Sequence, residues 1–395
     1  MSTIGADTNT HAERRKPTVL QIVPRLVTGG VERGTIDVAT ALLAAGWRPL
    51  IASEGGPMTR ELDRAGITHI KLPLASKNPF VIRANVDRLA ALIERMDVDI
   101  VHARSRAPAW SAHYAAKRTG RHFVTTFHNA YALGSIFKRK YNAVMATGER
   151  VIAISNFVAA HVADVYGVGP DRLRTIPRGV DIARFDPDRV TPERVIPLLK
   201  AWRIPDGASV VLLPGRLTRW KGQHVLVEAM AKLNRPDAVA VIMGSGRDGY
   251  RQELEAAAQR HGALASFRFV DDTADIAAAY MAADVVVSAS TSPEGFGRVI
   301  VEAQAMGRPV VATAHGGAQE TVVPGETGWL VPPGDAEALA ATLATVLDLD
   351  GKQRMALAKR SIAHIRTHFT AAQMTQKTLA VYEELMPQAA AIAAA

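Results

Sequence analysis

The sequence contains no cysteine, which excludes disulfide bonds and thiolate metal sites. No apolar run reaches the roughly 18 residues of a membrane-spanning helix. The nearest such run, residues 276–289, is broken by Asp284. The polar opening, residues 1–16, lacks the apolar core of a signal peptide, and we expect it to be a disordered tail. We therefore expect a cytoplasmic protein, placed at the inner face of the cytoplasmic membrane if its basic half docks there.

Aromatic residues are also scarce, at 6% of 395 residues, and none are interleaved with basic residues in the manner of a nucleic-acid-binding stretch. The excess of positive charge is unevenly distributed along the sequence. Residues 1–190 carry 27 Lys and Arg against 17 Asp and Glu, a net charge of +10, whereas the remainder carries −1. The basic first half favours an anionic partner, such as lipid headgroups or a phosphorylated acceptor. The same charges could also simply lie on a solvated surface.

Two carboxylates, Glu294 and Glu302, are separated by seven residues in the most informative stretch, residues 290–320. The apolar run 284–289 before them predicts a buried strand. Helical spacing begins after Gly297 and ends at Gly307, and residues 309–313 predict the next strand. Glu294 therefore belongs to a loop at the carboxyl end of a strand, and Glu302 to the helix that follows.

Ligands of open α/β sheets bind at this loop edge. The backbone N–H groups of Phe296, Gly297 and Arg298 would point out of a helix N-terminus, which suits a phosphate. Carboxylates accept hydrogen bonds from vicinal hydroxyls, so Glu294 and Glu302 suit a sugar or a ribose. Taken alone, each glutamate also has a simpler interpretation. Glu294 would be a solvated acid in a loop, and Glu302 would be an exposed helix residue.

A second loop of this kind follows the expected strand 209–214. It contains Gly215, Arg216 and Lys221. An arginine fork and a lysine ammonium can converge on a diphosphate.

Gly244, Gly246 and Gly249 form a Gly-x-Gly-x-x-Gly pattern after the expected strand 239–243, with Asp271 and Asp272 about 20 residues later. This pattern is typical of dinucleotide binding and supports an alternative, an NAD-dependent oxidoreductase. Against it, the pattern lies in the second strand–helix unit of its domain rather than the first.

The first half alternates expected strands with helices, which predicts a parallel sheet with helices on both faces. Gly30 follows the first strand, and His128 follows another at its carboxyl end. A helix over residues 135–146 contains Lys138, Arg139 and Lys140, which suit either a solvated face or an anionic acceptor. The expected strands are residues 18–23, 49–53, 69–72, 100–103, 123–127 and 151–155.

Residues 290–320, with Glu-Gly-Phe-Gly at 294–297, Gly-Arg-Pro-Val-Val-Ala at 307–312 and His-Gly-Gly-Ala-Gln-Glu at 315–320, resemble the nucleotide-sugar site of retaining family 4 glycosyltransferases. The resemblance covers nearly the whole chain. It implies the GT-B fold, an α/β architecture of two doubly wound Rossmann-like domains facing a cleft, with a C-terminal helix crossing back to the first domain. The implied domains are residues 17–190 with 372–387 on the acceptor side and 197–371 on the nucleotide-sugar side, after a tail of residues 1–16.

The resemblance also implies roles for individual residues. Glu294 would bind the transferred sugar with His128 nearby as the catalytic residues, and Glu302 would hold the ribose. The donor-binding residues would be Gly30, Arg216, Lys221, Gly244, Asp271, Phe296, Gly297, Arg298 and Glu302, with Glu32 as a weaker candidate. The acceptor side would include Arg104, Lys138, Arg139 and Lys140.

The function that the resemblance implies is retaining transfer of a hexose from GDP-mannose or a UDP-sugar to an envelope glycolipid of the lipopolysaccharide type. We expect no cofactor and no metal, because the Asp-x-Asp spacings at 97–99 and 186–188 fall before a buried strand and in a linker. We expect no nucleic-acid partner. A UDP-sugar 2-epimerase, which has the same architecture, is a further alternative function. A third alternative, a secreted two-domain solute receptor, would require an export signal, whose apolar core residues 1–16 lack.

Overall fold

The computed structural model describes residues 15–27, 29–131, 134–246 and 248–386. This described chain falls into two compact units. One contains the chain up to Thr125, Thr147–Glu149 and the segment from Leu379 onward; the other contains Thr126–Ala146 and Arg150–Thr378. Among the described residues, no helix is long and apolar enough to cross a membrane.

A seven-stranded sheet has the order β3-β2-β1-β4-β5-β6-β7. Its strands are β1 Thr18–Ile22, β2 Arg48–Ser53, β3 Thr68–Lys71, β4 Ile100–Ala103, β5 His122–Phe127, β6 Arg150–Ala153 and β7 Leu173–Thr175. The β1–β2 and β1–β4 pairs are both parallel, so the chain starts in the middle of the sheet and returns to the other side of β1. This reversal of order makes a topological switch point.

A six-stranded parallel sheet repeats the plan, with the order β10-β9-β8-β11-β12-β13. Its strands are β8 Ser209–Pro214, β9 Ala238–Met243, β10 Phe267–Val270, β11 Val285–Ser288, β12 Val310–Thr313 and β13 Trp329–Val331. The switch point here lies between β8 and β11, which pair through Val285 with Val211 and Val286 with Leu212. Loops that follow these two strands therefore emerge side by side.

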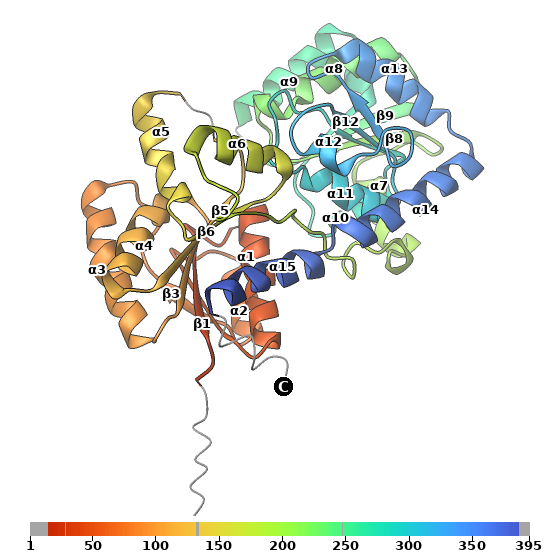
Figure 1. Cartoon of the computed structure of the whole chain (residues 1–395). Helices are drawn as coiled ribbons and strands as arrows, with labels where there is room; N and C mark the ends of the chain where they lie inside the picture. The colour runs from red at the N-terminus through yellow and green to blue at the C-terminus, as the bar shows by residue number, and fades with distance from the viewer. Residues whose placement is uncertain (1–14, 28, 132–133, 247, 387–395) are drawn as a thin grey trace, which may run out of the picture. The chain divides into compact units, whose positions relative to one another are not determined.

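Helices lie in the connections between strands, and α13, α14 and α15 follow the last strand, β13 (Figure 1). They are α1 Gly30–Ala44, α2 Thr59–Arg64, α3 Pro79–Arg95, α4 Arg106–Thr119, α5 Ile136–Asn142, α6 Asn156–Tyr166, α7 Pro192–Ala201, α8 Gln223–Leu233, α9 Asp248–Arg260, α10 Ile276–Met281, α11 Arg298–Ala305, α12 Ala318–Thr321, α13 Ala336–Leu347, α14 Gly351–His368 and α15 Ala371–Leu385. Helices α3 and α4 pack side by side.

The central strands β1 and β9 are buried along their whole length and mainly apolar, although β1 includes the polar residues Thr18 and Gln21, as expected for parallel strands covered on both faces. Every residue of β1 and of β9 is buried. The two doubly wound parallel sheets confirm the predicted α/β architecture.

Helix α7 was not predicted, because its sequence contains Pro192 and Pro197 and was interpreted as linker. Pro192 occupies the first turn, where a missing N–H costs nothing, and Pro197 lies inside the helix. Arg194 fixes α7 to the start of α10 through a two-fold hydrogen bond to Asp275, with lengths of 2.8 and 2.7 Å.

The last helix ends in the unit that contains β1 to β4. There Tyr382 of α15 is fully buried, its hydroxyl lies 2.6 Å from Nδ1 of His102, and its ring lies 6.3 Å from that of Trp47. Burial raises the pKa of Tyr382 and lowers the pKa of His102 well below 6.5, with nearby Arg104 lowering it further. The phenol therefore stays protonated beside a neutral imidazole.

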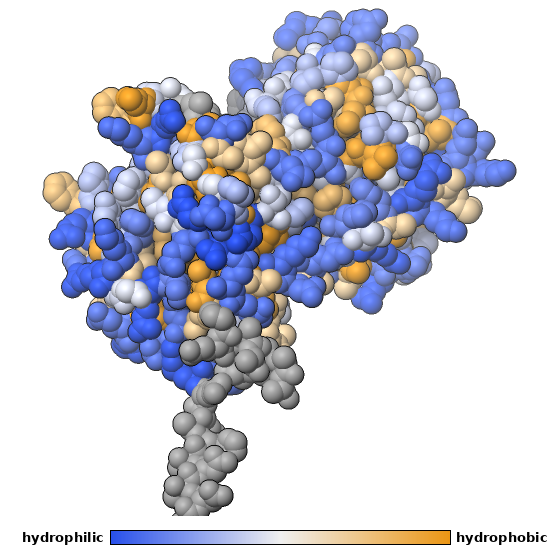
Figure 2. Space-filling model, viewed as in Figure 1, coloured by the Kyte–Doolittle hydropathy of each residue, from blue (hydrophilic) through white to orange (hydrophobic). Residues whose placement is uncertain are grey.

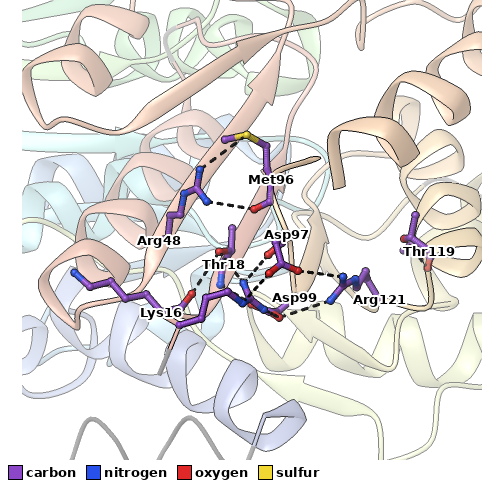
Figure 3. A network of polar contacts seen from close by, with 10 residues as sticks. Lys16, Thr18, Arg48, Met96, Asp97, Asp99, Thr119 and Arg121 are labelled. Atoms are coloured by element: carbon purple, nitrogen blue, oxygen red, sulfur yellow. Dashed lines mark hydrogen bonds and ion pairs between the residues drawn. The ribbon is translucent and has the colours of Figure 1, made fainter. Parts of the chain in front are cut away.

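The Asp-x-Asp spacing at residues 97–99 belongs to an ion-pair network at the start of β1 (Figure 3). Asp97 pairs with Arg15 at 2.8 Å and Arg121 at 3.2 Å. Asp99 pairs with the same two arginines and accepts the backbone N–H of Thr18 at 2.8 Å. These carboxylates therefore hold together the amino-terminal ends of β1 and β4.

Candidate functional site

The Glu294 carboxylate lies where the loops after β8 and β11 meet. Its Oε2 forms an ion pair of 2.7 Å with Nζ of Lys221, and its Oε1 accepts a 2.5 Å hydrogen bond from the hydroxyl of Ser290. The Lys221 and Glu294 side chains are each 18% exposed, so this ion pair is partly shielded from solvent. Since β8 and β11 flank the switch point, the pair lies at the end of the sheet where open α/β folds bind ligands.

Two glycines hold the Glu294 loop against α12. A Cβ on Gly316 would lie 2.4 Å from the carbonyl oxygen of Glu294, and one on Gly317 would lie 2.4 Å from Cα of Phe296. The N–H of Gly317 also donates to the Glu294 carbonyl at 2.9 Å. Only glycine permits this approach, so the Gly-Gly pair serves to fix the position of Glu294.

The N-terminus of α11 is formed by the residues predicted to bind phosphate. Gly297 is its N-cap and has a left-handed φ of 85°, and Arg298 is the first helical residue. The Phe296 side chain is buried against Phe369, with ring centroids 5.7 Å apart, so Phe296 offers a ligand only its backbone.

Glu302 is 6% exposed and already holds two partners. Its Oε2 accepts a 2.8 Å hydrogen bond from the hydroxyl of Tyr280, and its Oε1 pairs with Arg298 at 2.5 Å. Burial, followed by the charge of Glu302, raises the pKa of Tyr280 well above its ordinary value, which keeps the hydroxyl a donor. A carboxylate has about four acceptor positions, so Glu302 retains capacity for a ligand hydroxyl.

Arg216 and Lys221 behave differently. Arg216 is exposed, and its side chain forms no ion pair with any other residue that the structure describes. Lys221 is held between Glu294 and the ring of Trp220, whose centroid lies 4.7 Å from Nζ. The loop thus provides one cation with freedom to move and one with a fixed position.

The glycine pattern after β9 is explained by packing. A Cβ on Gly244 would lie 2.2 Å from the carbonyl oxygen of Gly215, and one on Gly246 would lie 2.4 Å from Cβ of Leu217. The first two glycines therefore let the loops after β8 and β9 approach each other, and need no dinucleotide to account for them. Residue 247 lies outside the described residues. Asp271 is largely exposed beyond β10, 3.9 Å from Arg251.

His128 follows β5, as predicted, and is half-buried. Its carbonyl oxygen lies 2.8 Å from the position that a Cβ on Gly295 would take. His128 and the Glu294 loop are therefore neighbours through their backbones.

Residues 28–184 match the family described as Glycosyltransferase Family 4, and residues 197–364 match Glycosyl transferases group 1. A glycosyltransferase structure from Rickettsia africae is 39% identical, covers 94% of this chain and 99% of that one, and superposes with a TM-score of 0.86. The chain belongs to the family 4 glycosyltransferases.

Other relatives of this family 4 glycosyltransferase differ in donor and acceptor. A "GDP-mannose-dependent monoacylated alpha-(1-6)-phosphatidylinositol monomannoside mannosyltransferase" of Corynebacterium glutamicum is 30% identical over 71% of this chain and 75% of its own length. A "D-inositol 3-phosphate glycosyltransferase" of Corynebacterium efficiens is 37% identical over 53% of this chain, and the match spans only 51% of that relative. The Anabaena protein HepE in complex with UDP-glucose is 25% identical, covers 93% and 99% of the two chains, and has a TM-score of 0.82.

These comparisons confirm the GT-B fold and the glycosyltransferase activity predicted for this family 4 enzyme. They give no support to the oxidoreductase alternative. They do not test the role of any individual residue, so the site residues remain predictions.

The predicted residues of the first half lie on different elements of this glycosyltransferase. Gly30 is the first residue of α1, and the side chain of Glu32 lies against Gly29. Lys138, Arg139 and Lys140 are exposed on α5. Arg104 is 3% exposed and donates to Oε1 of Gln21 at 2.8 Å, so it does not belong to an exposed basic face. Burial lowers the pKa of Arg104.

Sequence reasoning gave no individual role to Tyr280, Ser290 and Trp220, which contact predicted site residues, or to Glu320. Glu320 of α12 accepts the backbone N–H groups of Asn156 and Phe157 at 2.8 and 2.7 Å. A carboxylate at the start of α6 is stabilised by the positive end of the helix dipole. Ser290 and Trp220 lie within a few residues of a predicted site residue, and Glu320 ends the motif at 315–320, whereas Tyr280 carried no local signal.

Proposed function

We propose that this enzyme transfers a hexose, with retention of configuration and without a metal ion, from a nucleoside-diphosphate sugar to a glycolipid acceptor. The observation that carries this proposal is the Lys221–Glu294–Ser290 cluster beside the N-terminus of α11. It combines a cation and helix N–H groups for a diphosphate with a carboxylate for sugar hydroxyls.

In this proposal, Arg216 and Lys221 neutralise the charge that develops on the leaving diphosphate. Donors that are in place before reaction are the largest single source of rate in such sites. Glu302 accepts hydrogen bonds from the ribose, Glu294 orients the sugar, and His128 lies near the transferred sugar. The bond between the anomeric carbon and the diphosphate oxygen breaks, the acceptor hydroxyl attacks from the face on which the diphosphate leaves, and its proton passes to the departing diphosphate as the new glycosidic bond forms.

The donor is GDP-mannose or a UDP-sugar. GDP-mannose is named for the Corynebacterium glutamicum relative, and UDP-glucose is bound in the Anabaena structure. A thermal-shift screen of the purified protein against UDP, GDP, ADP and NAD would test this, because ligand binding to the native state raises Tm. We expect a shift with UDP or GDP and none with NAD. Conversion of the UDP-sugar to its 2-epimer without an acceptor would instead support the epimerase alternative.

We further propose that the enzyme meets its glycolipid acceptor at an anionic membrane, through the exposed face of α5. Ile136 and Phe137 are 67% and 80% exposed at the start of this helix, directly before Lys138, Arg139 and Lys140. Figure 2 shows hydrophobic surface over α5 beside hydrophilic surface. Apolar side chains next to basic ones match an interface of acyl chains and anionic headgroups.

Vesicle sedimentation tests this membrane contact. We expect binding to vesicles that contain phosphatidylglycerol, weaker binding to pure phosphatidylcholine, and loss of binding with Phe137→Ser. Met355→Ser is the matched control, because Met355 is 74% exposed on α14. Equal binding of the two variants would contradict the assignment to α5.

A further inference from the structure

Trp220 is a large aromatic residue, 40% exposed, beside the cluster that we assign to the donor. A partly exposed tryptophan contributes little to a core, so its place beside a charged cluster requires an explanation. Its neighbour Lys221 supplies one. The two residues are adjacent in the 3-10 turn η3 Arg219–Lys221, and that turn brings the ammonium of Lys221 to 4.7 Å from the indole centroid.

This turn is fixed on both sides. It ends at Gly222, which has a φ of 73° and where a Cβ would lie 1.8 Å from the carbonyl oxygen of Ala289. The carbonyl oxygen of Trp220 accepts the N–H of Thr291 at 2.8 Å. The turn is therefore tied to the loop that carries Glu294, and the indole has a defined position relative to that carboxylate.

The Lys221 ammonium thus has the indole as one neighbour and Glu294, at 2.7 Å, as another. A lysine ammonium has three N–H donors, and these two neighbours do not satisfy all of them. A free lysine side chain would lose rotamer freedom when it binds a phosphate, whereas a side chain that is already held loses less.

We propose that Trp220 is a positioning residue, whose ring face holds the Lys221 ammonium in place for the diphosphate of the donor through a cation–π interaction. This inference rests on the proposed function of the cluster. If the inference holds, nucleoside diphosphate binding depends on the electron density of the Trp220 ring. A role based only on the size of the ring or on its apolar burial would not create this dependence. Cation–π attraction at partly exposed sites predicts a weakening of nucleoside diphosphate binding by about two- to fivefold when the ring face is lost.

The test is site-specific replacement of Trp220 by mono-, di- and trifluorinated tryptophan, followed by calorimetric measurement of Kd for UDP and GDP. Fluorine removes electron density from the ring face and changes its shape little, so Kd should rise stepwise with fluorine number. Trp220→Phe should retain more affinity than Trp220→Leu, because phenylalanine keeps an aromatic face. Fluorinated tryptophan at position 329, in strand β13, is the matched control and should leave Kd unchanged.

The same series in a Lys221→Met background completes the test as a double-mutant cycle. The fluorine dependence should disappear there, because the cation is absent. A flat series in the otherwise unaltered protein, or a slope that persists with Lys221→Met, would overturn the positioning role while leaving the donor site intact. If the unaltered protein binds neither UDP nor GDP, the proposed function itself is contradicted, and the role of Trp220 with it.

Discussion

The Glu294 carboxylate is held by one cation and one hydroxyl, and its remaining acceptor positions suit sugar hydroxyls. Replacing it with glutamine retains the size of the side chain and removes its charge. We expect Glu294→Gln to reduce transfer by about 100-fold or more, as loss of a preorganised group in such a site does. Rate measurement with saturating donor checks this, and an unchanged thermal melt serves as the folding control. Full activity would refute the site assignment.

The hydrogen bond from Tyr280 to Glu302 gives a second prediction at this scale. Both groups are buried, so Tyr280→Phe should lower the free energy of unfolding by about 1.5–3 kcal/mol, as for hydrogen bonds to charged groups. Tyr250→Phe is the control, since its hydroxyl has only a 3.4 Å contact with His224. Urea denaturation of both variants measures the difference, and equal losses would argue against a charged partner for Tyr280.

Among the elements, the loop after β11 depends on its contact with α12. Gly316 has a φ of 59°, and a Cβ there would also collide with the Glu294 carbonyl. Gly316→Ala should therefore both destabilise the fold, by about 1 kcal/mol for the left-handed backbone, and reduce transfer by displacing Glu294. Gly325→Ala shares the strain, with a φ of 78°, and has no atom within 4 Å of the new Cβ. It should lose stability but keep its transfer rate; equal rates for the two variants would exclude the displacement.

Element prediction from sequence succeeded for the buried central strands and for β3, at one edge of the seven-stranded sheet, and failed at both edges of the six-stranded sheet. The runs at β1, β8 and β11 are mainly apolar, so their positions were predicted within one or two residues. Strands β10 and β13 were missed because they are short and only partly buried. Lys221 and Glu294 were each predicted from their loops, but their ion pair depends on β8 lying next to β11, which only the sheet order reveals. Tyr280 could not be predicted, because a residue 22 positions from Glu302 leaves no local pattern.

At the scale of the whole molecule, buried neutral histidines make stability depend on pH. Burial, with Arg104 adding to it, holds the pKa of His102 well below the ordinary 6.5. Below pH 6.5 the unfolded chain therefore binds a proton that the native state does not. The free energy of unfolding should fall as pH decreases, by up to about 1.4 kcal/mol per pH unit for this residue. His69 and His113 shift in the same direction.

Urea unfolding between pH 5 and 8 measures this dependence. His102→Asn keeps an acceptor for the Tyr382 hydroxyl and does not titrate, so its stability should vary less steeply below pH 6.5. A slope identical to that of the unaltered protein would show that His102 already takes up its proton in the native state.

The contact between His102 and Tyr382 joins residues 280 positions apart. A ribosome that adds about 5–20 residues per second needs tens of seconds to synthesise the chain between them. During that time the nascent first unit lacks the side chain that fills the space between Trp47 and His102. The unit of this glycosyltransferase that contains β1 to β4 therefore cannot complete its core until α15 has been synthesised.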